Sequence, residues 1–287
     1  MTTAFLPELP QLMVEEQVRA ALLEDLGRAG DITTNATIGP DRQATAEMNS
    51  RELGIIAGLP LAEAAFRLIN PAIKFQALLA DGARVEPGTM IARISGPARG
   101  LLSVERVALN YLMHLSGIAT YTARFADAIA HTSAKVTCTR KTIPGLRSVE
   151  KYAVRCGGGS SHRYGLDDAI LIKDNHIAVA GGIAEALKAA KAFAGHLVKI
   201  EIEVDTLEQF ETVLKEGADV CLLDNMGPEM LRKAVEMNQG RIVLEASGNV
   251  NLDTIKAIAE TGVDYISTSK ITMAAPTLDI GLDMAIG

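Results

Sequence analysis

Charged and polar side chains follow six short apolar runs in the second half of the chain. Arginine can bind two oxygens of a carboxylate or phosphate at once, and lysine adds a point charge. Carboxylates among such cations can hold Mg²⁺, bind sugar hydroxyls or face a developing cation. A purely structural fold does not need six such ends, so we interpret the set as functional. In order they are Arg140 and Lys141; Lys173; Glu203 and Asp205; Asp224 and Asn225; Glu245, Ser247, Gly248 and Asn249; Ser267, Thr268, Ser269 and Lys270.

The stretch RCGGGSSHRYGLDDAILIKDNH, residues 155–176, places three glycines and two serines directly before His162 and Arg163. A phosphate cradle, a lid and a plain linker all share this composition. From Lys135 to Lys173 the chain carries eight Lys or Arg and three Asp or Glu, a local balance of +5 within a net charge of -7. Either a solvated basic face or a pocket for an anionic ligand explains this balance.

The turn at Ser247, Gly248 and Asn249 stands between a predicted strand and a predicted helix. Its backbone N–H groups could therefore hold a phosphate at the helix N-terminus, where the last loops of α/β barrels often bind one. The lysine at residue 173 also raises a Schiff-base aldolase as an alternative. The density of cations argues against an aldolase, because this set is suited to holding several anionic groups.

A regular alternation of strand and helix patterns must position these residues. The apolar runs begin near residues 135, 169, 198, 219, 241 and 264, and amphipathic helical patterns lie between most of them. Gly217, Gly240 and Gly262 lie where helices should end. Repeated strand–helix units predict a parallel sheet that closes into an α/β barrel or stays open and doubly wound. Barrel sites lie at the carboxyl ends of the strands.

The first part of the chain lacks this rhythm and predicts a separate α+β domain. We expect a helix in LMVEEQVRAALLEDL, strands in ATAEMN and TMIARIS, and two helices separated by a break at Ser116–Gly117. The tail TLDIGLDM alternates apolar and polar residues, which favours a strand that pairs back onto this domain. The predicted domains are residues 1–112 together with the strand 276–287, and residues 113–275.

The composition excludes several classes of function. With 287 residues and 48% apolar content the chain suits one or two globular domains. The net charge of -7 gives no general attraction to nucleic acid or anionic membranes. We see no membrane-spanning run and expect no secretory signal. Cys138, Cys156 and Cys221 have neither zinc nor disulfide spacing, so a reducing cytosol is expected.

Six runs in the barrel half carry a shared pattern: TRKTIPGLR, KYAVRCGGGSSHRYGLDDAILIKDNH, IEVD, LLDNM, EASGNV and DYIS. Together they resemble the quinolinate phosphoribosyltransferases, also called nicotinate-nucleotide pyrophosphorylases (carboxylating). The resemblance extends to EDLGRAGDITT, SVERVALNYL and LDIGL and covers nearly the whole chain. It implies an N-terminal α/β sandwich domain plus an open, incomplete α/β barrel.

The resemblance also implies an activity. A cytoplasmic enzyme of de novo NAD synthesis would join quinolinate to 5-phosphoribosyl-1-diphosphate, with Mg²⁺, giving nicotinate mononucleotide, diphosphate and CO₂. Its homodimer would build each site at the interface, and assembly beyond a dimer is left open. A paralogous family associated with molybdenum transport shares the fold and much of the motif, and is kept as an alternative.

Site residues follow from the resemblance position by position. It places quinolinate contacts on Thr139, Arg140, His162, Arg163 and Lys173, with Arg106 from the neighbouring subunit. The glycine-rich loop would bring His162 and Arg163 over the anionic ring. Catalytic roles fall on Lys141 and Lys173 and on the acidic pair Glu203 and Asp224 near the ribose and the metal, and the phosphate turns are Ser247, Gly248, Asn249, Thr268, Ser269 and Lys270.

One run departs from the family pattern. Many relatives read SVGALTH where this chain reads STSKITM, residues 267–273. Ser269 replaces a glycine and Lys270 a small residue. An additional lysine at this turn is compatible with binding phosphate.

Overall fold

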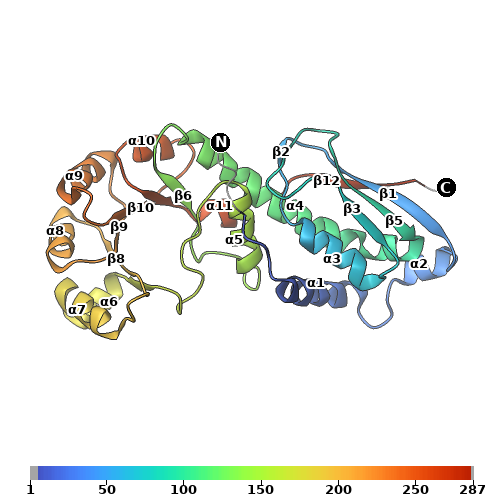
Figure 1. The fold of residues 1–287 in the computed structure, drawn as a ribbon, viewed down its shortest axis with the longest axis horizontal. Coiled ribbons are helices and arrows are strands. Elements are labelled where there is room, and N and C mark those ends of the chain that lie inside the picture. The colour runs from blue at the N-terminus through green and yellow to red at the C-terminus, as the bar shows by residue number, and fades with distance from the viewer. Residues whose placement is uncertain (1–5, 286–287) are drawn as a thin grey trace. The chain divides into compact units, whose positions relative to one another are not determined.

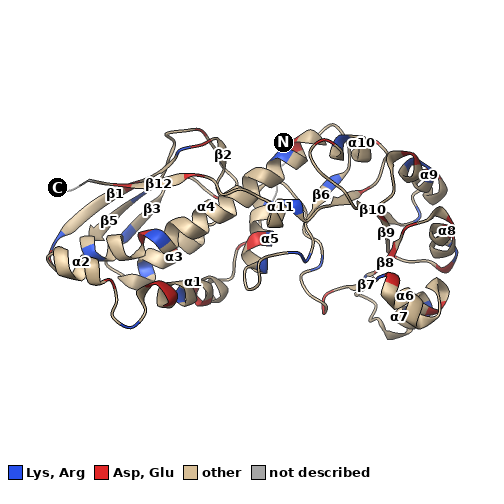
Figure 2. Cartoon of the chain, turned by 180° about the vertical axis from the view of Figure 1, so that it is seen from behind, with Lys and Arg blue, Asp and Glu red and all other residues tan. Residues whose placement is uncertain are grey.

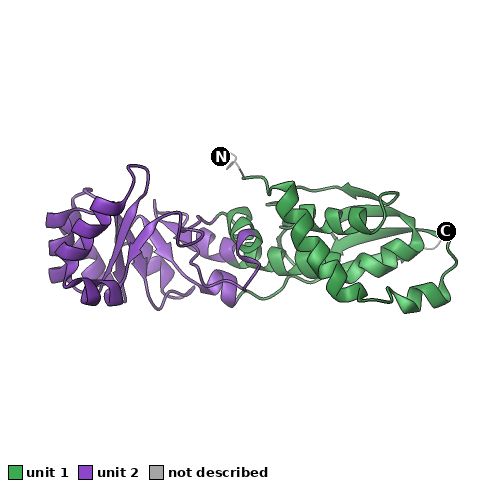
Figure 3. Ribbon diagram, turned by 90° about the horizontal axis from the view of Figure 1, so that it is seen from below, with its two compact units in different colours: residues 1–121, 149–158, 275–287 green, residues 122–148, 159–274 purple. Residues whose placement is uncertain are grey.

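The computed structural model describes residues 6–285, which divide into two compact units (Figure 3). The first unit comprises residues 1–121, 149–158 and 275–287, and the second comprises residues 122–148 and 159–274. The outermost residues, 1–5 and 286–287, belong to the predicted first domain and its C-terminal strand, and they lie outside the described part. Residues 113–121 and 149–158, which the sequence assigns to the barrel, fall in the first unit.

The first unit contains a four-stranded antiparallel sheet with the order β12-β1-β5-β3 (Figure 1). Along β1 the inward positions Ala46, Met48 and Ser50 are buried, as the period-two alternation of a strand requires. The elements of this unit are α1 (Gln11–Leu26), α2 (Ile32–Thr37), β1 (Gln43–Ser50), β2 (Gly54–Ile55), α3 (Leu59–Ile69), β3 (Lys74–Ala77), β4 (Arg84–Val85), β5 (Met90–Pro97) and β12 (Ile280–Ala285).

The predicted helix break at Ser116–Gly117 is wrong, because α4 (Ala98–Ala128) runs through it without interruption. Gly117 instead allows a close approach: a Cβ there would lie 2.0 Å from the carbonyl oxygen of Pro276. The Ser116 hydroxyl accepts a hydrogen bond from Ala57 N–H at 3.0 Å. The Ser-Gly pair is therefore a packing feature inside a helix.

The second unit is an open barrel of six parallel strands in the order β6-β11-β10-β9-β8-β7. The family fold expected from the sequence is confirmed, and most helices of this unit lie along one face of the sheet (Figure 1). Lys or Arg and Asp or Glu are interspersed over its helices (Figure 2). Its elements are β6 (Lys135–Thr137), β7 (Ile170–Ile172), α6 (Asp174–Ala180), α7 (Ile183–Phe193), β8 (Ile200–Val204), α8 (Leu207–Glu216), β9 (Val220–Asp224), α9 (Pro228–Asn238), β10 (Val243–Ser247), α10 (Ile255–Ala259), β11 (Tyr265–Ser267) and α11 (Lys270–Met273). The helix α5 (Arg147–Cys156) begins in this unit and continues in the first from Val149.

The glycine-rich run turns the chain from a helix into the barrel wall. Gly158, with φ of 84°, ends the turn after α5 in a conformation that favours glycine. Two residues later Ser160 pairs in parallel with Thr137 of β6, and its N–H donates to the Val136 carbonyl at 2.8 Å. Residues 160–170 then lead to β7, the opposite edge of the sheet. Within residues 6–285 no helix is long and apolar enough to cross a membrane.

Candidate active site

A cavity of about 790 Å³ lies at the carboxyl ends of the parallel strands. Glu203, Asp224 and Ser247 come from the last two residues of β8, β9 and β10, and parallel pairing brings these ends to one edge. The cavity collects the barrel residues predicted from the sequence: Thr139, Arg140, Lys141, His162, Arg163, Lys173, Glu203, Asp224, Ser247, Gly248, Asn249, Thr268, Ser269 and Lys270.

Lys173 and Glu203 form an ion pair across the ends of β7 and β8, with Nζ 2.7 Å from Oε2. The lysine side chain is 47% exposed and the glutamate 17%, so the ammonium group remains accessible from the cavity. The Lys173 N–H also donates to His176 Nδ1 at 3.0 Å, which fixes the backbone where α6 begins. The sequence did not single out His176, although it completes the KDNH run.

Asp224 is held by its neighbours rather than left flexible. It accepts hydrogen bonds from Ser247 Oγ and, at 2.7 Å, from Asn225 Nδ2. Gly248 has φ of 90°, and a Cβ there would lie 2.2 Å from Asn225 Oδ1. Only glycine therefore fits where the turn after β10 packs against the end of β9.

The predicted phosphate site at a helix N-terminus is not what this turn provides. The helix after it, α10, begins only at Ile255, well beyond Asn249. The turn itself still lines the cavity through Ser247, Gly248 and Asn249. After β11, Thr268 Oγ1 accepts the Lys270 N–H at 3.2 Å.

His162 contacts two buried carboxylates, and one of them, Glu245, also lines the cavity. Its Nε2 lies 2.9 Å from Glu201 Oε2 and 3.7 Å from Glu245 Oε1. The two contacts place both carboxylates around one ring nitrogen of His162. Sequence reasoning missed Glu201, yet the alternation IEIEV places it on the same face of β8 as Glu203. That alternation was the available signal.

Two arginines carry buried donors that other protein groups do not satisfy. Within the described residues, Nε of Arg140 and Nε of Arg163 are buried and have no hydrogen-bond partner. Burial, and next the charge of Arg140, lower the pKa of Arg163. Leaving such a donor unsatisfied costs roughly 1–3 kcal/mol, and more for a charged group. Both side chains line the cavity, so an anion bound there lies within reach of the two guanidinium groups.

The predicted site residue Arg106 lies elsewhere. It is on α4 within the first unit, with an exposed side chain, and it does not line this cavity.

The open barrel and the cation-lined cavity define an enzyme for anionic substrates, and comparisons narrow the class. Residues 118–283 match the quinolinate phosphoribosyl transferase, C-terminal domain, and residues 31–116 match the N-terminal domain. The chain belongs to the quinolinate phosphoribosyltransferase family. These matches do not favour the molybdenum-transport alternative.

Individual relatives agree over nearly the full length. The probable nicotinate-nucleotide pyrophosphorylase (carboxylating) of Bacillus subtilis is 41% identical over 275 residues, which cover 96% of this chain and 94% of that protein. The Mycobacterium leprae enzyme of the same name is 43% identical, covering 94% and 96%. The crystal structure of NadC from Streptococcus pyogenes matches with a TM-score of 0.94 at 39% identity, covering 97% and 99%.

Proposed function

We propose that the protein transfers the phosphoribosyl group of 5-phosphoribosyl-1-diphosphate to quinolinate and releases diphosphate and CO₂. The product is nicotinate mononucleotide, an intermediate of NAD synthesis. The observation that supports this most directly is the pair of buried, unpartnered Nε atoms on Arg140 and Arg163. Quinolinate carries two neighbouring carboxylates, and a guanidinium can bind each in fork geometry.

The chemistry follows from the placement of charge. The C1–O bond of the ribose breaks, diphosphate leaves, and the pyridine nitrogen forms the new bond to C1. The fixed carboxylates Glu203 and Asp224 stabilise positive charge on the ribose. When the adjacent carboxylate leaves as CO₂, its bonding electrons remain on C2 beside the positive ring nitrogen, and C2 then takes a proton. The residues act by positioning and charge compensation.

We assign each anionic group of the two substrates to a set of cationic side chains or to a turn of the cavity. We assign the quinolinate carboxylates to Arg140, His162, Arg163 and Lys173, assisted by Thr139. Lys141 lies beside Arg140 and suits the diphosphate, whose charge it offsets. The turns Ser247–Asn249 and Thr268–Lys270 take the 5-phosphate and the diphosphate. The extra lysine of STSKITM adds a cation to the second turn.

Mg²⁺ fits this set as an ion shared with the substrate. Glu203 and Asp224 offer hard oxygen ligands, and Mg²⁺ usually needs only one or two carboxylates beside substrate phosphates. When bound, it would offset the charge of the leaving diphosphate. We expect activity to require added Mg²⁺ and the purified protein to hold no stoichiometric transition metal. Full activity in excess EDTA would contradict this assignment.

We further propose a homodimer in which Arg106 enters the site of the neighbouring subunit. Arg106→Ala and Lys173→Ala should each be nearly inactive, but mixing them should restore roughly a quarter of the wild-type sites, because half of randomly mixed dimers carry one intact site. Subunit exchange is verified by mass spectrometry. Exchange without any gain over the single variants would exclude a shared site.

The decisive experiment for the reaction measures diphosphate release. Purified protein should release it with quinolinate and 5-phosphoribosyl-1-diphosphate, and nicotinate should be a poor substitute. A faster reaction with nicotinate would overturn the proposal.

We also place the enzyme in the cytoplasm. Cys138, Cys156 and Cys221 are buried and form no disulfide within the described residues. Burial raises the pKa of Cys156 to about 12 and raises that of Cys221 as well, so both remain thiols. A reducing compartment suits these cysteines.

A further inference from the structure

Arg147 does not line the cavity, but its side chain joins two segments that do. Its Nη1 donates to the Tyr164 carbonyl at 3.0 Å, directly after Arg163. Its Nε donates to Thr142 Oγ1 at 3.1 Å, and its Nη2 reaches the Arg140 carbonyl at 3.4 Å. One guanidinium therefore connects the segment after β6 with the segment that follows the glycine-rich run.

Other bonds also hold these two segments. The Ser160 N–H donates to the Val136 carbonyl at 2.8 Å, and Thr272 Oγ1 donates to the Lys141 carbonyl at 2.7 Å. Thr142 Oγ1 donates to the Arg140 carbonyl at 3.4 Å, which closes the first turn on itself. The second turn is closed by Asp168, which accepts the N–H groups of Tyr164 and Gly165 at 2.7 and 2.8 Å. The bridge between Thr137 and Ser160 joins the segments before these turns, whereas Arg147 joins the turns themselves, at the Arg140 carbonyl and at the residue after Arg163.

A force acts against this arrangement. Arg140 and Arg163 are like charges in a partly buried site, and burial followed by the Arg140 charge lowers the pKa of Arg163. Repulsion favours moving the two turns apart until an anion binds between them. A planar fork of five donors can bond several acceptors at fixed angles, which an ammonium group cannot do.

We propose that Arg147 is a positioning residue that sets the spacing of Arg140 and Arg163, and thereby the preference for a substrate with two neighbouring carboxylates. This proposal rests on the assignment of quinolinate as the substrate. It requires no contact between Arg147 and the substrate, because the effect passes through the two backbone carbonyls.

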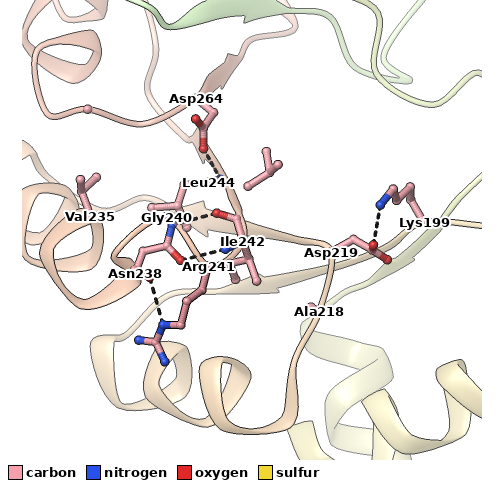
Figure 4. A pocket seen from close by; sticks show the side chains of 12 residues that line it. Lys199, Ala218, Asp219, Val235, Asn238, Gly240, Arg241, Ile242, Leu244 and Asp264 are labelled. Carbon is pink, nitrogen blue, oxygen red and sulfur yellow. Dashed lines mark hydrogen bonds and ion pairs between the residues drawn. The ribbon is translucent and has the colours of Figure 1, made fainter.

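Arg241 supplies a matched control at the opposite end of the sheet. Its guanidinium also binds backbone carbonyls, donating from Nε to Asn238 at 3.0 Å (Figure 4) and from Nη2 to Met237. It lies beside a different cavity, away from the predicted site residues. Replacing it removes the same kind of interaction without touching the turns that carry Arg140 and Arg163.

The test compares steady-state kinetics of Arg147→Lys and Arg241→Lys with the wild type. Arg147→Lys should raise KM for quinolinate by about ten-fold, the equivalent of one well-placed interaction. KM for 5-phosphoribosyl-1-diphosphate and kcat at saturation should stay within about two-fold, because the acidic pair and phosphate turns are unchanged. The ratio of kcat/KM for quinolinate over nicotinate should fall. Arg241→Lys should match the wild type in all of these constants.

A wild-type quinolinate KM in Arg147→Lys would overturn the positioning role. An equal rise of KM for both substrates, or the same change in Arg241→Lys, would show a general loss of structure and would also overturn it. If Arg147→Lys does not fold, Thr142→Val removes one acceptor of the guanidinium and should raise the quinolinate KM selectively. Absence of quinolinate turnover in the wild type itself would instead overturn the proposed function.

Discussion

At the amino ends of the parallel strands, polar side chains bond to the backbone, whereas at the carboxyl ends they face a cavity. Asp219 accepts hydrogen bonds from Lys199 Nζ at 2.6 Å and from the Ile200 N–H at 2.9 Å. Asp264 accepts the Leu244 N–H at 2.8 Å, and Asn238 bonds both the N–H and the carbonyl of Ile242 (Figure 4). These groups fix the places where strands begin.

At the carboxyl ends of the strands, some buried polar atoms have no hydrogen-bond partner within the described residues. Nε of Arg140 and Arg163 is buried and unpartnered in the described part of the chain, and so is Oε1 of Glu201. Such groups reduce stability unless something binds them. A cavity of about 540 Å³ at the amino end is thus a structural feature, while the cavity of about 790 Å³ is suited to ligand binding. Hydrogen-bond satisfaction, rather than cavity size, distinguishes them.

The largest expected effect comes from Arg163→Met. It should lower kcat/KM for quinolinate by about 10²- to 10³-fold, because bonds to a charged group contribute roughly 1.5–3 kcal/mol each. The free energy of unfolding, measured by urea denaturation, should change little, because the lost bond from Nη1 to the Ala169 carbonyl is offset by removing a half-buried charge beside Arg140. Arg241→Met should show the reverse: unchanged kcat/KM and about 1 kcal/mol less stability.

Equal losses of stability in the two variants would remove the distinction between the ends. A loss of activity in Arg241→Met would show instead that the amino end also supports catalysis.

A glycine pair gives a smaller effect of the same kind. Gly248 and Gly240 both have positive φ, 90° and 73°, so alanine is strained at either position, by about 1–2 kcal/mol. A Cβ at Gly248 would also clash with Asn225, whereas a Cβ at Gly240 meets nothing within 4 Å. Gly248→Ala should displace Asp224 and lower kcat/KM by about 10²-fold. Gly240→Ala should lose stability only, and matching activity in the two variants would contradict the role of the turn.

The sequence predicted the strand ends well because their signal is local. Apolar runs and helical patterns recur with a fixed spacing, and parallel pairing then gathers residues such as Lys173 and Asp224 at one edge. The elements whose role depends on distant packing were misassigned. A Ser-Gly pair such as Ser116–Gly117 is typical of a helix break. Here Gly117 instead allows the backbone of Pro276, which is distant in sequence, to approach the helix closely.

The residues that the sequence did not reveal also depend on contacts with distant parts of the chain. Glu201 and Arg147 act through contacts 39 and 17 positions away, with His162 and with Tyr164. Neither contact is encoded by a short motif. The family resemblance supplied Arg106, which no spacing argument placed in a site.

The smallest expected effect tests the amino end alone. Although burial opposes ionisation, hydrogen bonds from Lys199 and from the Ile200 N–H lower the pKa of Asp219 below its ordinary 3.8. A carboxylate with a lowered pKa stabilises the fold above the pKa of the unfolded chain, and this contribution is lost as the pH falls through the folded value. Asp219→Asn should therefore lower the free energy of unfolding by about 1 kcal/mol at pH 7, a modest value for a partly exposed group. The difference from the wild type should shrink below about pH 4, and kcat/KM should not change.

Asp253→Asn, at an exposed loop position, serves as the control for net charge. A difference in stability that persists unchanged to pH 3 would mean that Asp219 acts through packing rather than through its charge.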